Sequence, residues 1–199
     1  GYDIGALAIA QQLGRAFGVT VIAAPVSRLV ADANRAPRHP KTSGSELRGL
    51  LREQRAALLA RYHSPHRAAV ERCIRERIAA GRRIVHVGVH TFTPVLIGIV
   101  RKAEIGLLYD PSRRWETLLC QRWQRVLAAQ LPGMRIRRNY PYRGVTDGLT
   151  RTMRERFADD AYAGIELEVS QALVERAPTN RRPWLTAIER SLGEILADA

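Results

Sequence analysis

Strand-like and helical segments alternate along this sequence, and that order constrains its fold more than any other feature. Short aliphatic runs typical of buried strands occupy residues 19–24, 84–89, 104–109, 134–138 and 164–169. Helices are predicted at residues 4–17, 46–62, 65–80 and 114–130, after residue 148 and after residue 183. The alternation predicts an α/β fold with a mixed, mainly parallel sheet and helices on both faces. Because no repeat or linker interrupts it, we expect residues 1–199 to form a single domain.

The composition is typical of one globular domain in a reducing compartment. The chain has 199 residues, 46% of them apolar, which is enough for a substantial core. It contains no run of 18 apolar residues and does not begin like a signal peptide, so we expect no membrane association and a cytoplasmic location. Cys73 and Cys120 lack CxxC spacing and are interpreted as structural thiols.

The net charge of +13 raises the question of nucleic-acid binding. Only Lys41 and Lys102 are lysines among the 32 basic residues, and this bias towards arginine is equally typical of a GC-rich genome. The arginines are scattered over helices, including one with Arg151, Arg154 and Arg156, where solvated faces are the simplest interpretation. No nucleic-acid-binding motif is present, so we expect no nucleic-acid partner.

Polar residues follow several predicted strands, at residues 27–35, 90–93, 140–147 and 166–171. Ligands of open α/β sheets bind at the carboxyl ends of the strands, so these segments are the candidates for a functional site. In the first, Arg28, Asn34 and Arg35 are suited to binding a carboxylate, and Asp32 to orienting one of the arginines. A solvated loop with local ion pairs is the alternative.

His90 ends the second of these strands, where an imidazole is well placed to bind a metal or transfer a proton. A lone histidine there is more often structural, and His86, four residues earlier, is interpreted as packing. In the last strand, alternation places Glu166 and Glu168 on one face. A carboxylate near a strand end can act as a general base, but for Glu166 an ordinary exposed strand face is preferred.

Seven segments, in order, together resemble the N-formylglutamate amidohydrolase family over nearly the whole chain. They are DIGA at residues 3–6, SRLVADANR at 27–35, YHSPHRAAVE at 62–71, VHTFTPVL at 89–96, EIGLLYD at 104–110, NYPYRGVTDGLT at 139–150 and IELEVSQ at 165–171. The resemblance implies a phosphorylase/hydrolase-like α/β fold and kinship with zinc carboxypeptidase-like and aspartoacylase-like hydrolases.

The resemblance also implies a reaction, a cofactor and residue roles. The reaction is the zinc-dependent hydrolysis of a small N-acyl acidic amino acid, with N-formylglutamate as reference substrate and formate and glutamate as products, as in one route of histidine degradation. One divalent zinc ion is the implied cofactor. Asn34 and Arg35 resemble the substrate-carboxylate clamp, His90 a zinc ligand and Glu168 the general base and acid. Arg28 and Arg143, the latter in the loop at residues 140–147, are further candidates for binding substrate.

The sequence departs from the family pattern at three places. The family takes two zinc ligands from a His- and Glu-containing motif ahead of DIGA, so the chain is expected to be N-terminally truncated and to lack that motif and its strand. Thr91 stands where many relatives have serine, and Ser170 where relatives often have arginine.

Two other functions compete with the amidohydrolase hypothesis. The loop at residues 28–35 also suits a non-catalytic carboxylate- or phosphate-binding protein, and the charge alone suits a nucleic-acid-binding module. The sequence carries no signal for an oligomeric state.

Overall fold

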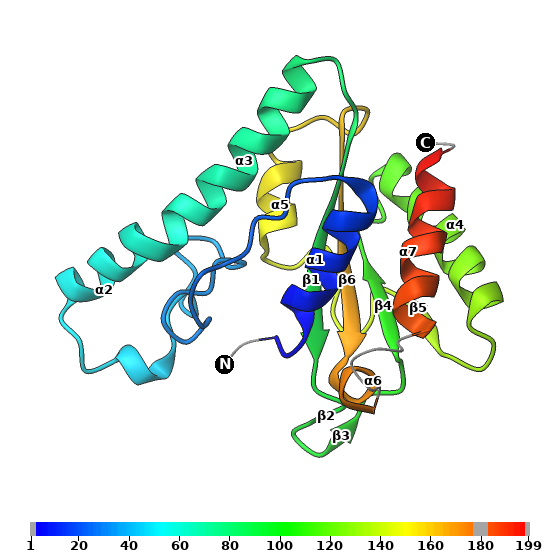
Figure 1. The fold of residues 1–199 in the computed structure, drawn as a ribbon. Helices are drawn as coiled ribbons and strands as arrows, with labels where there is room; N and C mark the ends of the chain where they lie inside the picture. Colours follow the sequence, from blue (N-terminus) through cyan, green and yellow to red (C-terminus); the bar gives the residue numbers. More distant parts are fainter. Residues whose placement is uncertain (1–2, 177–182, 198–199) are drawn as a thin grey trace.

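The computed structural model describes residues 3–176 and 183–197 and is built around a four-stranded sheet (Figure 1). In order across the sheet, the strands are β1 (Ile84–Phe92), β6 (Tyr162–Ser170), β4 (Ile105–Leu108) and β5 (Ile136–Arg138). β1 pairs with β6 in parallel, as does β4 with β5, whereas β4 and β6 are antiparallel. The predicted class, a mixed and mainly parallel sheet, is therefore confirmed.

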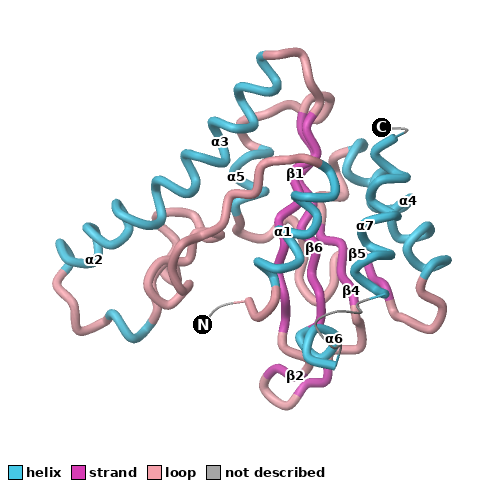
Figure 2. Tube along the Cα trace, viewed as in Figure 1, coloured by secondary structure: helices cyan, strands magenta, loops and turns pink. Residues whose placement is uncertain are grey.

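Helices cover both faces of this sheet, as predicted (Figures 1 and 2). The main core lies between one face and the helices α1 (Ala6–Phe17), α4 (Arg114–Gln130) and α7 (Pro183–Ala197). A smaller core on the opposite face is formed with α3 (Ser64–Ala79) and α5 (Leu149–Arg154). The short helix α6 (Gln171–Arg176) follows directly from the carboxyl end of β6.

The central strand β6 is buried on both sides, which corrects one expectation. Ile165 and Leu167 belong to the main core, and the alternate residues face the other side of the sheet. Glu166, expected on an exposed strand face, is only 9% exposed and accepts a hydrogen bond from Thr150 Oγ1 at 2.9 Å. The reason is that α5, which carries Thr150, covers this face of the strand.

The predicted strand at residues 19–24 is absent, although its composition is β-branched. The segment is irregular and mostly exposed, with Val19 57% exposed. The Val19 N–H donates to Gly14 O at 3.0 Å and so closes the end of α1, and the side chain of Val21 packs beside Gly14. The chain therefore turns back over its own helix and pairs with no strand of the sheet.

The two helices predicted for residues 46–80 are replaced by a different arrangement. A 3₁₀ turn (Ser45–Leu47) precedes α2 (Arg52–Leu58), and a π-helical turn (Leu59–His63) joins α2 to α3 without a break. A separate helix was expected to start at Pro65, which lacks an N–H donor. The π-turn just before Pro65 accommodates the missing hydrogen bond, so the helix continues. No helix in the described residues is both long and apolar enough to cross a membrane.

A β-hairpin that was not predicted follows β1, formed by β2 (Val95–Leu96) and β3 (Ile99–Val100). Its two-residue turn has positive φ at both positions, 49° at Ile97 and 75° at Gly98. Glycine favours this conformation and isoleucine disfavours it. Only the second turn residue is therefore of a type that predicts a hairpin.

Candidate active site

His90 and Glu168 lie side by side near the carboxyl ends of the parallel strands β1 and β6. They are Cα partners in the ladder between β1 and β6, and both face the side of the sheet away from the main core. Because aligned residues of parallel strands point to the same face, a common site is built from segments 78 positions apart. The structure thus brings together two of the residues that the sequence analysis singled out.

Glu168 is a buried carboxyl group without a hydrogen bond at one of its oxygens. Its side chain is 5% exposed, and Oε2 has no partner among the described residues. Burial raises the pKa of Glu168 to about 7, against the lowering effect of His90, and the negative charges of Glu166 and Asp3 act in the same direction as burial. A carboxyl group with this pKa can take up and return a proton near neutral pH.

The imidazole of His90 is oriented by Asp3. Its Nδ1 lies 2.7 Å from Asp3 Oδ2, and Arg28 Nη1 lies 3.4 Å from the other oxygen of the same carboxylate. Burial alone would raise the pKa of Asp3, but the hydrogen bond to His90 and the charges of His90 and Arg28 hold it below its usual range. Asp3 is therefore ionised and accepts the proton of Nδ1.

Burial alone would lower the pKa of His90, but the bond to Asp3 and the charges of Glu166, Glu168 and Asp3 raise it to about 9. Asp3 was quoted in the sequence only as part of DIGA, and no local pattern indicates a contact made across 87 positions. This residue was therefore missed as part of the site.

The pairing of Asp3 with His90 fits a metal-binding histidine. Such histidines almost always donate their second ring N–H to a carboxylate, which leaves the other nitrogen for the metal. Nδ1 of His90 is bonded to Asp3, so Nε2 is the nitrogen that would face a metal ion. Within residues 3–176 and 183–197, no three His, Cys, Asp or Glu side chains are grouped to hold a metal ion. The described chain thus offers one fitting ligand, His90.

The loop with Asn34 and Arg35 is tied to the segment before α5. The Leu149 N–H donates to Asn34 Oδ1 at 2.7 Å, and Arg35 Nη1 donates to Asp147 O at 3.3 Å. A Cβ atom at Gly148 would lie 3.1 Å from Glu166 Oε1 and 3.3 Å from Asn34 Oδ1, so Gly148 permits this close approach. Asn34 is thereby held against the glutamate face of the sheet, and its amide nitrogen makes no hydrogen bond to a described residue.

Asp32 orients both nearby arginines, which extends the expectation that it would orient one. Its Oδ2 lies 3.7 Å from Arg28 Nε and 3.9 Å from Arg35 Nε. Arg28 therefore joins Asp32 to Asp3, and the loop is linked to His90. Arg143 is not brought into this group: it is exposed, and its side chain makes no hydrogen bond or ion pair with a described residue.

Arg67 supports the loop from below, a role not recognised in the sequence. It is buried, and its Nη1 donates to three successive carbonyl oxygens, at 3.0 Å for Ala33, 3.3 Å for Asn34 and 3.0 Å for Arg35. His63 Nε2 lies 2.9 Å from the same Arg35 oxygen. Both residues belong to the motif at residues 62–71. A basic side chain in the first turns of a predicted helix was the only local sign of their role.

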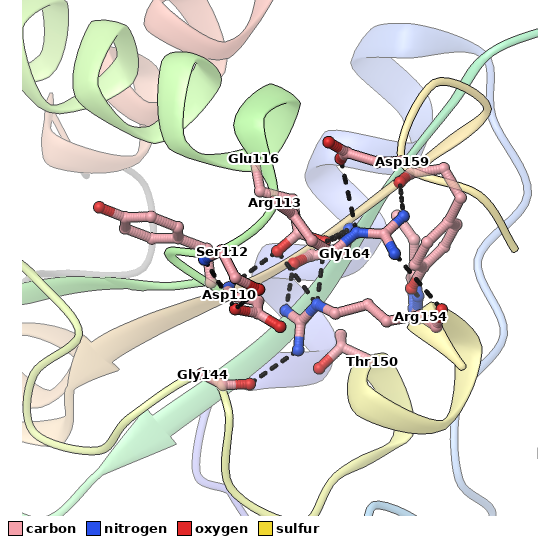
Figure 3. A network of polar contacts seen from close by, with 12 residues as sticks. Asp110, Ser112, Arg113, Glu116, Gly144, Thr150, Arg154, Asp159 and Gly164 are labelled. Carbon is pink, nitrogen blue, oxygen red and sulfur yellow. Dashed lines mark hydrogen bonds and ion pairs between the residues drawn. The ribbon is translucent and has the colours of Figure 1, made fainter. Parts of the chain in front are cut away.

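A second buried arginine, Arg154, holds the loop at residues 140–147 in place (Figure 3). Arg154 forms an ion pair with Glu116 at 2.9 Å and donates to the carbonyl oxygens of Gly144, at 2.7 Å, and Gly164, at 2.6 Å. It was expected on a solvated helix face, but it is only 9% exposed because these partners enclose it. The network fixes the loop at residues 140–147 against β6.

A model of the N-formylglutamate amidohydrolase family matches residues 1–175. The chain belongs to this family. The resemblance carried by the seven sequence motifs is thereby confirmed, and the family indicates an enzyme that hydrolyses amide bonds.

Two solved structures resemble this N-formylglutamate amidohydrolase family member. A gene product of Agrobacterium tumefaciens is 30% identical with a TM-score of 0.78, and the match covers 98% of this chain and 78% of that one. An N-formylglutamate amidohydrolase from Ralstonia eutropha is 16% identical with a TM-score of 0.53, covering 74% of this chain and 56% of that one. The second likeness is one of fold. No curated protein matches the chain.

Proposed function

We propose that this chain carries the substrate loop, one metal ligand and the proton-transfer carboxylate of a zinc-dependent amidohydrolase. The reaction is hydrolysis of an N-acyl acidic amino acid, of which N-formylglutamate is the type, to the amino acid and a carboxylic acid. The observation that carries the proposal is the buried pair of Glu168 and His90 at adjacent strand ends. Membership of an amidohydrolase family supports it.

Glu168 is the group proposed to move the proton. Its pKa of about 7 lets the carboxylate accept a proton from the attacking water and donate it to the departing amine nitrogen. His90 is the proposed ligand, and Asp3 fixes the ring through Nδ1, which leaves Nε2 for the metal. Zinc, when bound, polarises the acyl carbonyl and makes water more acidic.

The loop at residues 27–35, called the arginine loop below, is proposed to bind the carboxylates of the substrate. The amide nitrogen of Asn34 and the guanidinium of Arg35 supply donors for one carboxylate, and Arg28 supplies positive charge next to His90. Arg143 lies on an exposed loop and is proposed to contact substrate from there.

A catalytic role explains the buried carboxylates better than a purely binding role does. Glu166 and Glu168 lie on neighbouring positions of one strand face, and burial together with the charge of Glu166 raises the pKa of Glu168. A non-catalytic carboxylate- or phosphate-binding site would gain from neutral donors there. An enzyme that must shuttle a proton needs a carboxyl group of this kind.

The proposal is tested by measuring zinc content and formate release in the full-length protein. We expect about one zinc per chain and release of formate from N-formylglutamate. His90→Ala should weaken zinc binding by more than about 100-fold. His86→Asn, on the same strand face, is the matched control and should keep its zinc. An active protein without zinc, or a His90→Ala protein with unchanged zinc affinity, contradicts the proposal.

A further inference from the structure

A hollow of about 550 Å³ opens beside the proposed site, between the arginine loop and α2. Arg28 and Asp32 form its inner side, and Lys41, Arg48 and Arg55 lie around the rest. Its volume lies in the range of small-molecule sites and exceeds what a single carboxylate needs. The catalytic residues proposed above, His90 and Glu168, do not line it.

Basic side chains outnumber acidic ones around this hollow, although the carboxylate of Glu46 lies beside its lining residue Gly44. The side chains of Lys41, Arg48 and Arg55 make no hydrogen bond or ion pair within the part of the chain that the structure describes. Asp32 is the acidic residue in the lining, and it already lies near both Arg28 and Arg35. Uncompensated cations around a concave surface repel one another and attract an anion into it.

Arg28 belongs both to the hollow and to the proposed active site. Its Nη1 lies 3.4 Å from Asp3, which in turn holds His90 at 2.7 Å. Asp32 connects the lining to Arg35 in the same way. The hollow is therefore linked through Arg28 and Asp32 to the residues proposed to act on the acyl group and to bind the first carboxylate.

We infer that the hollow binds a second acidic residue of an extended substrate, an N-acylated acidic dipeptide such as N-formyl-Glu-Glu. The inference rests on the proposed function and extends its substrate class. The chemistry is unchanged: water adds to the formyl carbon, the carbon–nitrogen bond breaks, and a proton from water goes to the amine of the dipeptide. Arg48, Arg55 and Lys41 determine specificity by binding the carboxylates of the second residue.

The test compares N-formyl-Glu-Glu with N-formyl-Glu-Gln and N-formylglutamate in the full-length protein. The two dipeptides match in size and differ by one charge. The double variant Arg48→Gln with Arg55→Gln should raise KM for N-formyl-Glu-Glu at least about tenfold, since each charge-assisted bond contributes that much. KM for N-formylglutamate should change less than about twofold. Arg52→Gln, exposed on α2 near Arg55, is the control and should change KM for neither substrate.

Binding of the free dipeptide Glu-Glu, measured by calorimetry, separates this inference from the proposed reaction. Loss of binding in the Arg48/Arg55 double variant supports the hollow even if the protein releases no formate from any substrate. If wild type hydrolyses N-formylglutamate but the double variant binds Glu-Glu as well as wild type does, the inference is wrong. Displacement of Glu-Glu by inorganic phosphate at equal ionic strength, with equal affinity, also overturns it.

Discussion

At the level of single residues, Arg67 decides how firmly the loop at residues 27–35 is held. Its guanidinium bonds through Nη1 to the carbonyl oxygens of Ala33, Asn34 and Arg35 and through Nη2 to the hydroxyl of Thr152, and one lysine ammonium cannot reach both groups of partners in the same geometry. It acts through the loop and has no proposed contact with substrate. Arg67 is thus a positioning residue.

Replacing Arg67 should therefore affect binding more than chemistry. We expect Arg67→Lys to raise KM for N-formylglutamate about tenfold with kcat changed less than about threefold, because the loop binds ground state and transition state alike. Arg67→Met should lower the free energy of unfolding by about 2–4 kcal/mol, because it strands buried carbonyl groups. Arg72→Lys, exposed on the same helix, is the control. A well-folded Arg67→Lys protein with wild-type KM would contradict this role.

Asp3 makes a second prediction at this scale. Asp3→Asn keeps the shape of the side chain but removes the charge that the Nδ1 proton of His90 faces. Zinc affinity should fall about 10–100-fold, as expected for a partner of a metal ligand. Competition with a chelator of known affinity measures it. Asp160→Asn, at an exposed position, serves as the control, and equal affinities in the two variants would exclude the role of Asp3.

At the element scale, β4 and the loop after β5 pack with no space for a side chain between them. A Cβ atom at Gly106 would lie 2.0 Å from the backbone oxygen of Tyr140, whereas at Gly49 it would meet no atom within 4 Å. Gly106 thus allows the loop at residues 140–147 to lie over the strand.

Gly106→Ala should lower the free energy of unfolding by about 3 kcal/mol or more, because backbone must move to relieve the clash. Gly49→Ala should change it by less than about 0.5 kcal/mol. Chemical denaturation of both variants gives the comparison. Similar stability of the two proteins would show that the packing of this loop on β4 is wrong.

The elements that the sequence predicted are those whose signal is local. The helix α4 (Arg114–Gln130) has the bounds expected from its amphipathic run, and α1 ends at Gly18, as expected. The strand expected at residues 19–24 failed because β-branched composition does not supply a pairing partner. The break expected before Pro65 failed because a π-turn can absorb the lost hydrogen bond inside one helix.

At the scale of the whole molecule, the site depends on contacts that no local pattern encodes. His90 and Glu168 were singled out by their places near strand ends and by the family resemblance, and the parallel ladder places them together. Asp3 and Arg67 were not, because each gains its role from a segment far away in the sequence. Arg154 was misjudged for the same reason, since its partner Glu116 lies on another helix.

The stability of the molecule should depend on pH through His86. Burial lowers the pKa of His86 to about 4, and the charges of Arg154, His90 and His66 act in the same direction, while Nδ1 lies 2.8 Å from the hydroxyl of Tyr162. Between pH 6.5 and 4 the unfolded chain binds a proton at this residue that the folded chain does not. Folding stability from His86 is therefore complete above pH 6.5 and is lost as pH falls towards 4.

The difference in free energy of unfolding between wild type and His86→Gln reports this effect, because titrating groups that do not interact with His86 cancel. From pH 7 to pH 4, the wild type should lose about 1–2 kcal/mol of unfolding free energy relative to His86→Gln. This is less than the full change in pKa would give, because the imidazole is half-buried. A difference that stays constant with pH would show that His86 is not held neutral by its surroundings.

The proposal that Glu168 moves the proton in an amidohydrolase reaction is tested by measuring kcat for formate release by the full-length Glu168→Gln protein. The substitution keeps size and burial but cannot carry a proton. We predict a fall in kcat of about 10²–10⁴-fold with zinc content unchanged. A zinc-loaded Glu168→Gln protein with kcat within about threefold of wild type would contradict the account.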